Sequence, residues 1–277
     1  FSIVPLLNGN CKKIISVRGM LHPGALSQKP FKKKLFISLL KKSGITKKII
    51  FHTTDEKETG YVKKIFGKDV KAVAIQNFSN TAVLQQSLIK HPGKVKLVTV
   101  ALISPMKNHA LTLLALKDVS AFVEYDIYGP VKDQKYWSHC LQIISTLPSN
   151  VKVNYNGIVD PSKVSSVLVQ NHCLIMPSKS ENFSHAIYES LSSGVPVITS
   201  YFTPWNDLKK YKVGWNVDID NLQTITSAIE AFASFDEKEY RNWSTSSIAF
   251  AERTIDIHKI KNQYRNLFNL TVSNSKE

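Results

Sequence analysis

Short apolar runs alternate with helical patterns along the chain from Lys94 onward. The runs are rich in β-branched residues, an alternation that is typical of repeated βαβ units on a parallel sheet. We therefore predict one doubly wound α/β domain over residues 94–250. Its predicted strands are residues 95–100, 122–128, 151–155, 173–176, 195–199 and 214–217, and its predicted helices are residues 109–116, 134–147, 162–170, 185–192 and 206–211.

The pattern before residue 94 predicts a second, smaller domain of the same kind over residues 1–93. Three short strands make a thin sheet, and the sequence opens with Phe1 inside an apolar stretch, so we expect part of this domain to precede Phe1. The C-terminal segment 251–277 is predicted to be a helix that packs back toward the N-terminal domain. The predicted strands are residues 14–17, 48–52 and 70–75, the predicted helices are residues 30–42 and 56–66, and the predicted linker is His91-Pro92-Gly93.

The charge of the 277-residue chain is concentrated in its first third. The whole chain carries a formal charge of +15, and residues 1–93, with 17 basic and 4 acidic residues, carry +13 of it. A hydrophobic content of 43% excludes disorder, and the three cysteines are too far apart for a zinc ribbon or a disulfide framework. With no membrane-length apolar run and no signal-peptide pattern, we expect a cytoplasmic protein.

The segment after the predicted strand 173–176 carries the richest chemistry. In an open α/β sheet, ligands bind beyond the carboxyl ends of the strands. Here the chain leaves a buried strand and enters a helix, with Ser184 as the expected N-cap. The unpaired N–H groups of the first turn and the positive end of the helix dipole would face the crevice. This arrangement suits an anion such as a diphosphate.

Two carboxylates frame the start of that helix. Glu181 lies in the loop before it, and Glu189 lies about one and a half turns inside it. Side chains so placed can contact different parts of one extended ligand and accept hydrogen bonds from vicinal hydroxyls. From the residues alone an alternative stays open, in which Glu181 is a helix-start acid and Glu189 a solvated surface residue.

A resemblance to a known family is carried by the run Glu181-Asn182-Phe183-Ser184-His185 through Glu189, with residues 190–198 after it. This run resembles the paired-glutamate motif of retaining nucleotide-sugar glycosyltransferases with the GT-B fold. The chain is similar to glycosyltransferase family 4, group 1, in its bacterial surface-polysaccharide branch. The resemblance implies two Rossmann-like domains, the N-terminal one partial. Further segments match in order, namely residues 16–21, 103–108, 126–130, 156–158, 203–205 and 214–215.

The resemblance implies roles for the paired glutamates and for one lysine. Glu189 would hold the ribose hydroxyls of the nucleotide, and Glu181 would lie beside the donor sugar. Lys107 stands where the family has a diphosphate-binding lysine, so Glu181 and Lys107 are the candidate catalytic residues. An ammonium there can neutralise the leaving diphosphate, so we expect no metal site and no cofactor beyond the nucleotide-sugar substrate.

The remaining donor contacts implied by the resemblance come from the backbone. The N–H groups of Asn182, Phe183 and Ser184 would bind the hydroxyls and the phosphate of the donor. Gly129 and Gly157 follow predicted strands, and we expect them to let the backbone approach the nucleotide closely.

One departure from the family pattern concerns the phosphate site. Relatives usually have Gly-Arg-Leu before the lysine segment, where the arginine also contacts phosphate, but this chain has Ala101-Leu102-Ile103. Leucine cannot donate a hydrogen bond, so another basic residue must supply the charge, or donor binding is weak. Lys179 and Arg18 are the candidates.

On the acceptor side, Arg18 stands where many relatives carry a histidine, and we expect it to contact the acceptor or a phosphate. His22 and His185 are isolated histidines, for which a structural role is the more common one.

The basic segment 29–42 places Phe31, Leu35, Leu39 and Lys42 along one stripe with lysines beside it. It could rest on an anionic membrane that presents a lipid-linked acceptor, or the stripe could face the core. No nucleic-acid motif is present.

The implied reaction moves a sugar from a nucleotide diphosphate to a glycan or lipid-linked acceptor with retention at the anomeric carbon. In the usual mechanism, the acceptor attacks from the face that the phosphate leaves, and the departing oxygen takes its proton. The chain as given is expected to show little turnover. Two alternatives stay open: a non-catalytic or degenerate nucleotide-sugar-binding module, and a nucleotide-sugar epimerase on the same scaffold.

Overall fold

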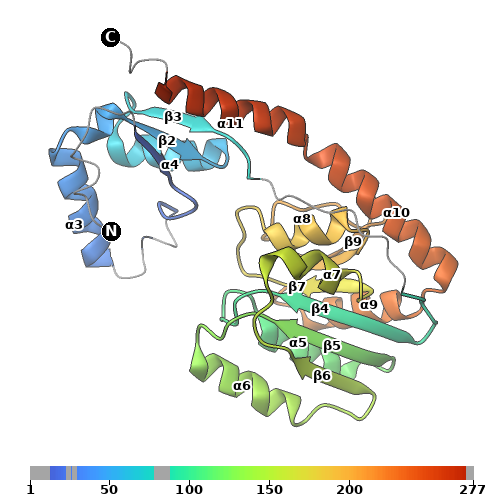
Figure 1. Cartoon of the computed structure of the whole chain (residues 1–277). Helices are drawn as coiled ribbons and strands as arrows, with labels where there is room; N and C mark the ends of the chain where they lie inside the picture. The colour runs from blue at the N-terminus through green and yellow to red at the C-terminus, as the bar shows by residue number, and fades with distance from the viewer. Residues whose placement is uncertain (1–12, 23–25, 27–29, 78–87, 273–277) are drawn as a thin grey trace. The chain divides into compact units, whose positions relative to one another are not determined.

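The computed structural model describes residues 13–22, 26, 30–77 and 88–272 of the chain (Figure 1). The apolar stretch at residues 1–7, Cys11 and Lys29 lie outside the described residues. Contacts divide the chain into two compact units, which are described separately. The first comprises Phe1–Phe78 with Asp256–Glu277, and the second comprises Ser79–Ile255.

The first unit is built on a parallel sheet, which in its described residues has the strand order β1-β2-β3. Lys13 pairs with Ile49, and Ile50 pairs with Lys71. Strand β2 is fully buried, and Asp55 caps the helix after it by accepting the N–H of Glu58 at 2.7 Å. Because these local signals are strong, the elements match the predicted ones closely. They are β1 (Lys13–Ser16), α3 (Pro30–Lys42), β2 (Ile49–Thr53), α4 (Glu56–Phe66), β3 (Lys71–Ala74) and α11 (Ile257–Val272).

The basic helix α3 turns its predicted stripe away from the core. Phe31, Leu35 and Leu39 are 80%, 53% and 49% exposed. The core is contacted instead by Leu40, which is buried, and by Phe36, which is partly buried. The alternative of a core-facing stripe is therefore wrong for these three residues, and α3 carries an apolar surface among lysines.

The second unit contains a six-stranded parallel sheet in the order β6-β5-β4-β7-β8-β9. This is the doubly wound arrangement in which the chain winds outward from the centre in both directions. The predicted strands are all present, and only the fifth is shifted, by about two residues at its start. They are β4 (Lys94–Val100), β5 (Phe122–Tyr128), β6 (Val151–Tyr155), β7 (Cys173–Met176), β8 (Val197–Ser200) and β9 (Gly214–Val217).

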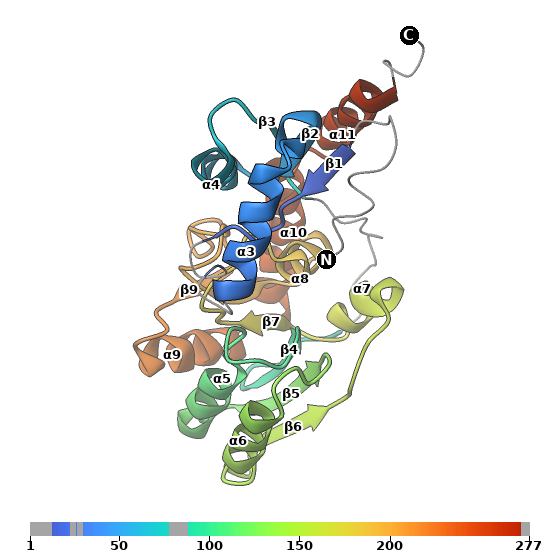
Figure 2. The same ribbon diagram turned by 90° about the vertical axis from the view of Figure 1, so that its left-hand side faces the viewer.

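Helices cover both faces of this sheet (Figures 1 and 2). One layer contains α5, α6 and α9, and the other contains α7, α8 and α10. The buried side chains between the layers, such as Leu97, Tyr125 and Ile175, form the core. The helices are α5 (His109–Ala115), α6 (Gln134–Ile144), α7 (Val164–Leu168), α8 (His185–Ser192), α9 (Leu222–Ala233) and α10 (Glu237–Thr254).

The predicted domain boundary after residue 93 falls inside the second unit. The Lys90 side chain is buried there, and its ammonium donates to the carbonyl oxygens of His91, Ala233 and Phe235 at 2.9, 2.8 and 3.0 Å. These bonds tie the segment before β4 to the carboxyl end of α9. The predicted break at residue 250 also shifts, because α10 continues to Thr254 and only the residues from Asp256 onward cluster with the first unit.

The helix predicted at 206–211 does not form. Asp207 and Lys212 have positive φ values of 58° and 55°, which a helix does not allow. The Asn216 side chain replaces the helical hydrogen bonds, since it accepts from the N–H of Leu208 at 3.2 Å and donates to the carbonyl of Trp205 at 2.7 Å.

Two further findings concern the cysteines and the membrane. Cys140 and Cys173 are buried and unpaired. Among the helices of the described residues, none combines the length and the apolar character that crossing a bilayer requires.

Candidate active site

The strand order of the second unit reverses between β4 and β7. The two strands pair through Leu97 with Cys173 and Val98 with Leu174, and the chain leaves them toward opposite faces of the sheet. Loops that diverge in this way open a crevice beyond the carboxyl ends of the strands. The loop after β4 carries Lys107, and the loop after β7 carries Glu181.

Lys107 and Glu181 form an ion pair across this crevice. Their side chains are 21% and 9% exposed, so both charges are largely removed from water. The two loops are also joined through the backbone, because the N–H of Lys179 donates to the carbonyl of Met106 at 2.9 Å. The structure thus brings together the two candidate catalytic residues, which lie far apart in the sequence.

The start of α8 presents unused hydrogen-bond donors. Ser184 is the residue at the N-cap position, with a φ of 62°, but its side chain makes no capping bond. Within the described part of the chain, the N–H groups of Asn182, Phe183 and Ser184 have no hydrogen-bond acceptor. The positive end of the helix is therefore open at the same loop that holds Glu181.

The Phe183 side chain anchors this loop in the core. It is buried, and its ring lies 5.6 Å from that of Trp205 and 5.9 Å from that of Tyr188. The indole N–H of Trp205 donates to the carbonyl of Phe183. His185 is exposed and makes an edge contact with the same ring. Phe183 thus fixes the loop by packing and leaves only its N–H for a ligand.

Glu189 is half-buried in α8, the helix that starts at the Glu181 loop. Its position five residues after Ser184 puts it more than one turn into the helix. The two glutamates are therefore held by one continuous segment, with Glu181 before the helix and Glu189 within it.

The two predicted glycines differ in what they do. Gly129 has a φ of 141°, and a β-carbon there would lie 1.9 Å from the carbonyl oxygen of Ala101, so only glycine lets the ends of β4 and β5 pack this closely. Its N–H donates to the carbonyl of Gly157 at 2.7 Å. Gly157 has a φ of 72° and open space around it. Close packing within the protein thus accounts for Gly129, whereas Gly157 borders open space.

The two residues proposed to replace the missing arginine belong to different units. Leu102 is 42% exposed beyond β4. Lys179 is exposed in the loop bonded to Met106, the neighbour of Lys107. Arg18 belongs to the first unit, where it follows β1 with a φ of 46° and an exposed side chain. Lys179 is therefore the basic residue that shares a unit with Lys107.

The sequence analysis missed two buried residues, one in each unit. His109 follows the Lys107 loop, and burial, reinforced by the charge of Lys107, lowers its pKa to about 4, so its ring is neutral at pH 7. In the first unit, buried Glu58 accepts the N–H of Gly19 and that of Thr54, the latter at 2.7 Å, and so holds the turn beside Arg18. The neutral state of His109 has no local sequence signal, since it depends on burial, whereas Asp55 followed three residues later by Glu58 is the local pattern of a capped helix start.

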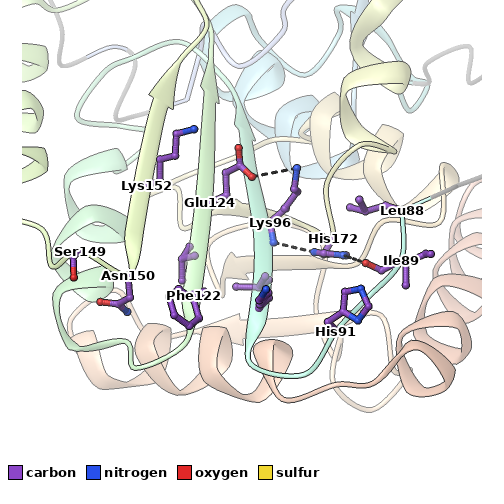
Figure 3. A pocket seen from close by; sticks show the side chains of 13 residues that line it. Leu88, Ile89, His91, Lys96, Phe122, Glu124, Ser149, Asn150, Lys152 and His172 are labelled. Carbon is purple, nitrogen blue, oxygen red and sulfur yellow. Dashed lines mark hydrogen bonds and ion pairs between the residues drawn. The ribbon is translucent and has the colours of Figure 1, made fainter.

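A cavity of about 320 Å³ lies at the opposite, amino edge of the same sheet (Figure 3). Lys96 pairs with Glu124 at 3.1 Å, and its N–H donates to Nδ1 of His172 at 2.9 Å. The other ring nitrogen of His172 lies 3.3 Å from the carbonyl oxygen of Ile89. None of the predicted site residues lines this cavity. Among the described residues, no group of three or more His, Cys, Asp or Glu is placed to hold a metal ion.

Comparison with known proteins finds a family model that matches most of the second unit. The family model of the glycosyl transferases, group 1, matches residues 81–248. No curated protein matches the sequence.

Solved structures share the fold of the chain. One is Alr3699/HepE of Anabaena in complex with UDP and glucose, with a TM-score of 0.68, 15% identity, and coverage of 92% of this chain and 71% of that one. Another is the sucrose-phosphate synthase of Thermosynechococcus elongatus, with a TM-score of 0.69, 15% identity, and coverage of 97% and 70%. A third is WaaG, a glycosyltransferase involved in lipopolysaccharide biosynthesis, with a TM-score of 0.61, 12% identity, and coverage of 80% and 63%. The chain therefore has the Rossmann-like GT-B fold.

Proposed function

Because the chain belongs to the group 1 glycosyl transferases, we propose that it transfers a sugar from a nucleoside diphosphate to a glycan or lipid-linked acceptor, with retention at the anomeric carbon. The observation that supports this most is the Lys107–Glu181 pair at the point where the strand order reverses, next to three N–H groups that have no acceptor among the described residues. A cation, a carboxylate and free amides are what a sugar diphosphate requires.

Each group has a distinct part in the proposed reaction. The ammonium of Lys107 moves from Glu181 to the diphosphate and stabilises the charge that develops as it leaves. The N–H groups at the start of α8 hold the phosphate and sugar hydroxyls, and Glu189 accepts from the ribose. Glu181 then orients the sugar. The acceptor hydroxyl attacks from the face that the phosphate leaves, and the departing phosphate oxygen takes the proton of that hydroxyl. These steps use no metal and no further cofactor.

The neighbours suggest which substrates to try first. Alr3699/HepE of Anabaena was solved with UDP-glucose, which makes a UDP-hexose the first donor to test. WaaG is involved in lipopolysaccharide biosynthesis, which supports a role in bacterial surface polysaccharide synthesis.

The exposed stripe of α3 supports a peripheral site at the inner face of the cell membrane. Phe31, Leu35 and Leu39 can enter the interface while lysines on the same helix, such as Lys32 and Lys34, meet anionic headgroups. Arg18 belongs to the same unit and is the proposed acceptor-side residue. Leu35→Ser should weaken sedimentation with anionic vesicles, and equal binding to neutral vesicles would contradict the proposal.

The donor proposal is tested by thermal unfolding with UDP-, GDP- and ADP-sugars. A ligand at 100 times its dissociation constant adds about 2.7 kcal/mol to the free energy of unfolding. Glu189→Ala should abolish the stabilisation, whereas Glu252→Ala, which removes an exposed glutamate of α10, should leave it intact. Stabilisation that survives in Glu189→Ala would refute the ribose role.

One observation favours a second function, a nucleotide-sugar-binding module without catalysis. Leu102 is exposed where relatives carry the phosphate-binding arginine, so the leaving diphosphate has one cation fewer. Tight donor binding with no transfer to any acceptor would support this function. Release of the nucleoside diphosphate from the donor would support the transferase.

A further inference from the structure

The turn after β8 carries two consecutive residues with large, exposed aromatic side chains. Tyr201 is 63% exposed and Phe202 is 55% exposed, while Thr203 and Trp205, which follow them, are buried. Apolar surface left in water forgoes the stabilisation that burial would provide, so a pair of exposed aromatic rings is a candidate binding surface.

Hydrogen bonds hold this turn in one conformation. The hydroxyl of Ser200 accepts the N–H of Phe202 at 3.1 Å and donates to the carbonyl of Ser178 at 2.5 Å. The hydroxyl of Thr203 accepts the N–H of Trp205 at 3.3 Å. The backbone that carries the aromatic pair is therefore fixed to the loop after β7, and the two rings project from an ordered turn.

The turn adjoins the ion pair of the candidate site. The N–H of Glu181 donates to the carbonyl of Phe202 at 3.0 Å, and β8 is the immediate neighbour of β7 in the sheet. The aromatic pair and the Glu181 carboxylate therefore come from two hydrogen-bonded loops at the same edge of the second unit.

We propose that Tyr201 and Phe202 form an aromatic subsite for the sugar ring handled at the Lys107–Glu181 site, an inference that rests on the proposed function. A pyranose presents hydroxyls at its rim and a flat face of C–H groups. Charged and amide groups bind the rim, and an aromatic ring covers the apolar face, so a site with both kinds of group fits a sugar better than it fits a nucleoside diphosphate alone. The phenol of Tyr201 adds a hydrogen-bonding group for a ring hydroxyl.

The test compares a ligand that contains the sugar ring with a ligand that lacks it. Binding of UDP and of UDP-glucose is measured by calorimetry for wild type, Tyr201→Ala, Phe202→Ala and the double variant, with GDP and ADP pairs in parallel. Phe122→Ala is the matched control, since Phe122 is 62% exposed at the amino edge of the same sheet. Tyr201→Phe keeps the aromatic ring, so its contact with the apolar face of the sugar should be as strong as in wild type.

A second arm uses methyl α-glucopyranoside without any nucleotide. Its binding is followed through the NMR shifts of the aromatic rings in labelled protein. Shifts at Tyr201 and Phe202, absent at Phe122, show that the pair binds a sugar ring even when no diphosphate anchors it. This arm stays informative if wild type binds none of the nucleotides, a result that would refute the proposed donor function by itself.

The double variant should lose about three- to tenfold in affinity for the nucleotide sugar, as expected for lost aromatic contacts, with affinity for the nucleoside diphosphate unchanged. That result assigns the pair to the donor sugar, and an effect confined to the methyl glycoside assigns it to an acceptor sugar. Equal loss for both nucleotide ligands, a lowered unfolding temperature of the double variant, or no effect in either arm would overturn the proposal.

Discussion

At the amino edge of the six-stranded sheet, the buried side chains of Lys90 and His172 are bonded to the backbone, whereas at the carboxyl edge several backbone N–H groups have no acceptor among the described residues. Lys90 meets three carbonyl oxygens, and both nitrogens of His172 lie within hydrogen-bond distance of the backbone. The cavity lies at this bonded edge. The start of α8, by contrast, keeps free amides and an uncapped helix end. Unused hydrogen-bonding capacity therefore identifies the proposed site better than empty volume does.

The largest effect is expected from Lys90→Met at the amino edge. Burial lowers the pKa of Lys90 to about 8, so the side chain is still an ammonium at pH 7 and satisfies the last carbonyls of α9. Losing it should reduce the free energy of unfolding by about 3 kcal/mol, with nucleotide binding unchanged. Urea unfolding measures this, with exposed Lys94→Met as the control. An unchanged unfolding midpoint would mean that this edge is not held by Lys90.

Acid should destabilise the same edge through His172. Burial lowers its pKa from 6.5 to about 4, so its full contribution is present above pH 6.5 and is lost as the pH falls to 4, a loss of roughly 3 kcal/mol. His109 has a similarly lowered pKa and contributes to the total. The difference between wild type and His172→Gln in the pH dependence of the free energy of unfolding isolates the contribution of His172. If both proteins show the same dependence on pH, His172 does not titrate as described.

Lys107→Ala tests the carboxyl edge. Removing the cation should weaken nucleoside diphosphate binding by about 2 kcal/mol or more, roughly 30-fold in affinity. Lys152→Ala is the matched control, because Lys152 is an exposed lysine that lines the cavity at the other edge. Calorimetry that found the Lys152 variant weakened and the Lys107 variant unchanged would reverse the comparison between the edges.

The smallest effect is expected from Glu181→Gln. Without the carboxylate, Lys107 no longer has to leave an ion pair to reach a phosphate, so nucleoside diphosphate affinity should rise by about threefold. Weaker nucleoside diphosphate binding would show that Glu181 assists Lys107 in binding the phosphate rather than competing for its ammonium.

Local patterns predicted most of the fold and the loops that carry the candidate site residues. The alternation of β-branched runs predicted the strands of the second unit, and the sequence correctly placed Glu181 in the loop between β7 and α8 and Glu189 within α8. The pairing of Lys107 with Glu181 was not predictable, because it depends on the strand order that brings two distant loops together.

Where prediction failed, a tertiary contact overrode the local signal. Ser184 occupies the N-cap position without capping, and the side chain of Asn216 replaces the helix expected at 206–211. Lys90 directly precedes the predicted linker His91-Pro92-Gly93, where a lysine would normally be exposed, yet it is buried against the end of α9. The direction in which the α3 stripe faces likewise depends on which side of the helix meets the core.

The most direct test of the central claim is a titration of the 15N-labelled protein with the nucleoside diphosphate that stabilises it, followed by NMR. The amide resonances of Asn182, Phe183 and Ser184 are predicted to shift, together with that of Lys107. Shifts confined to Lys96, Phe122 and His172 at the amino edge would contradict the account.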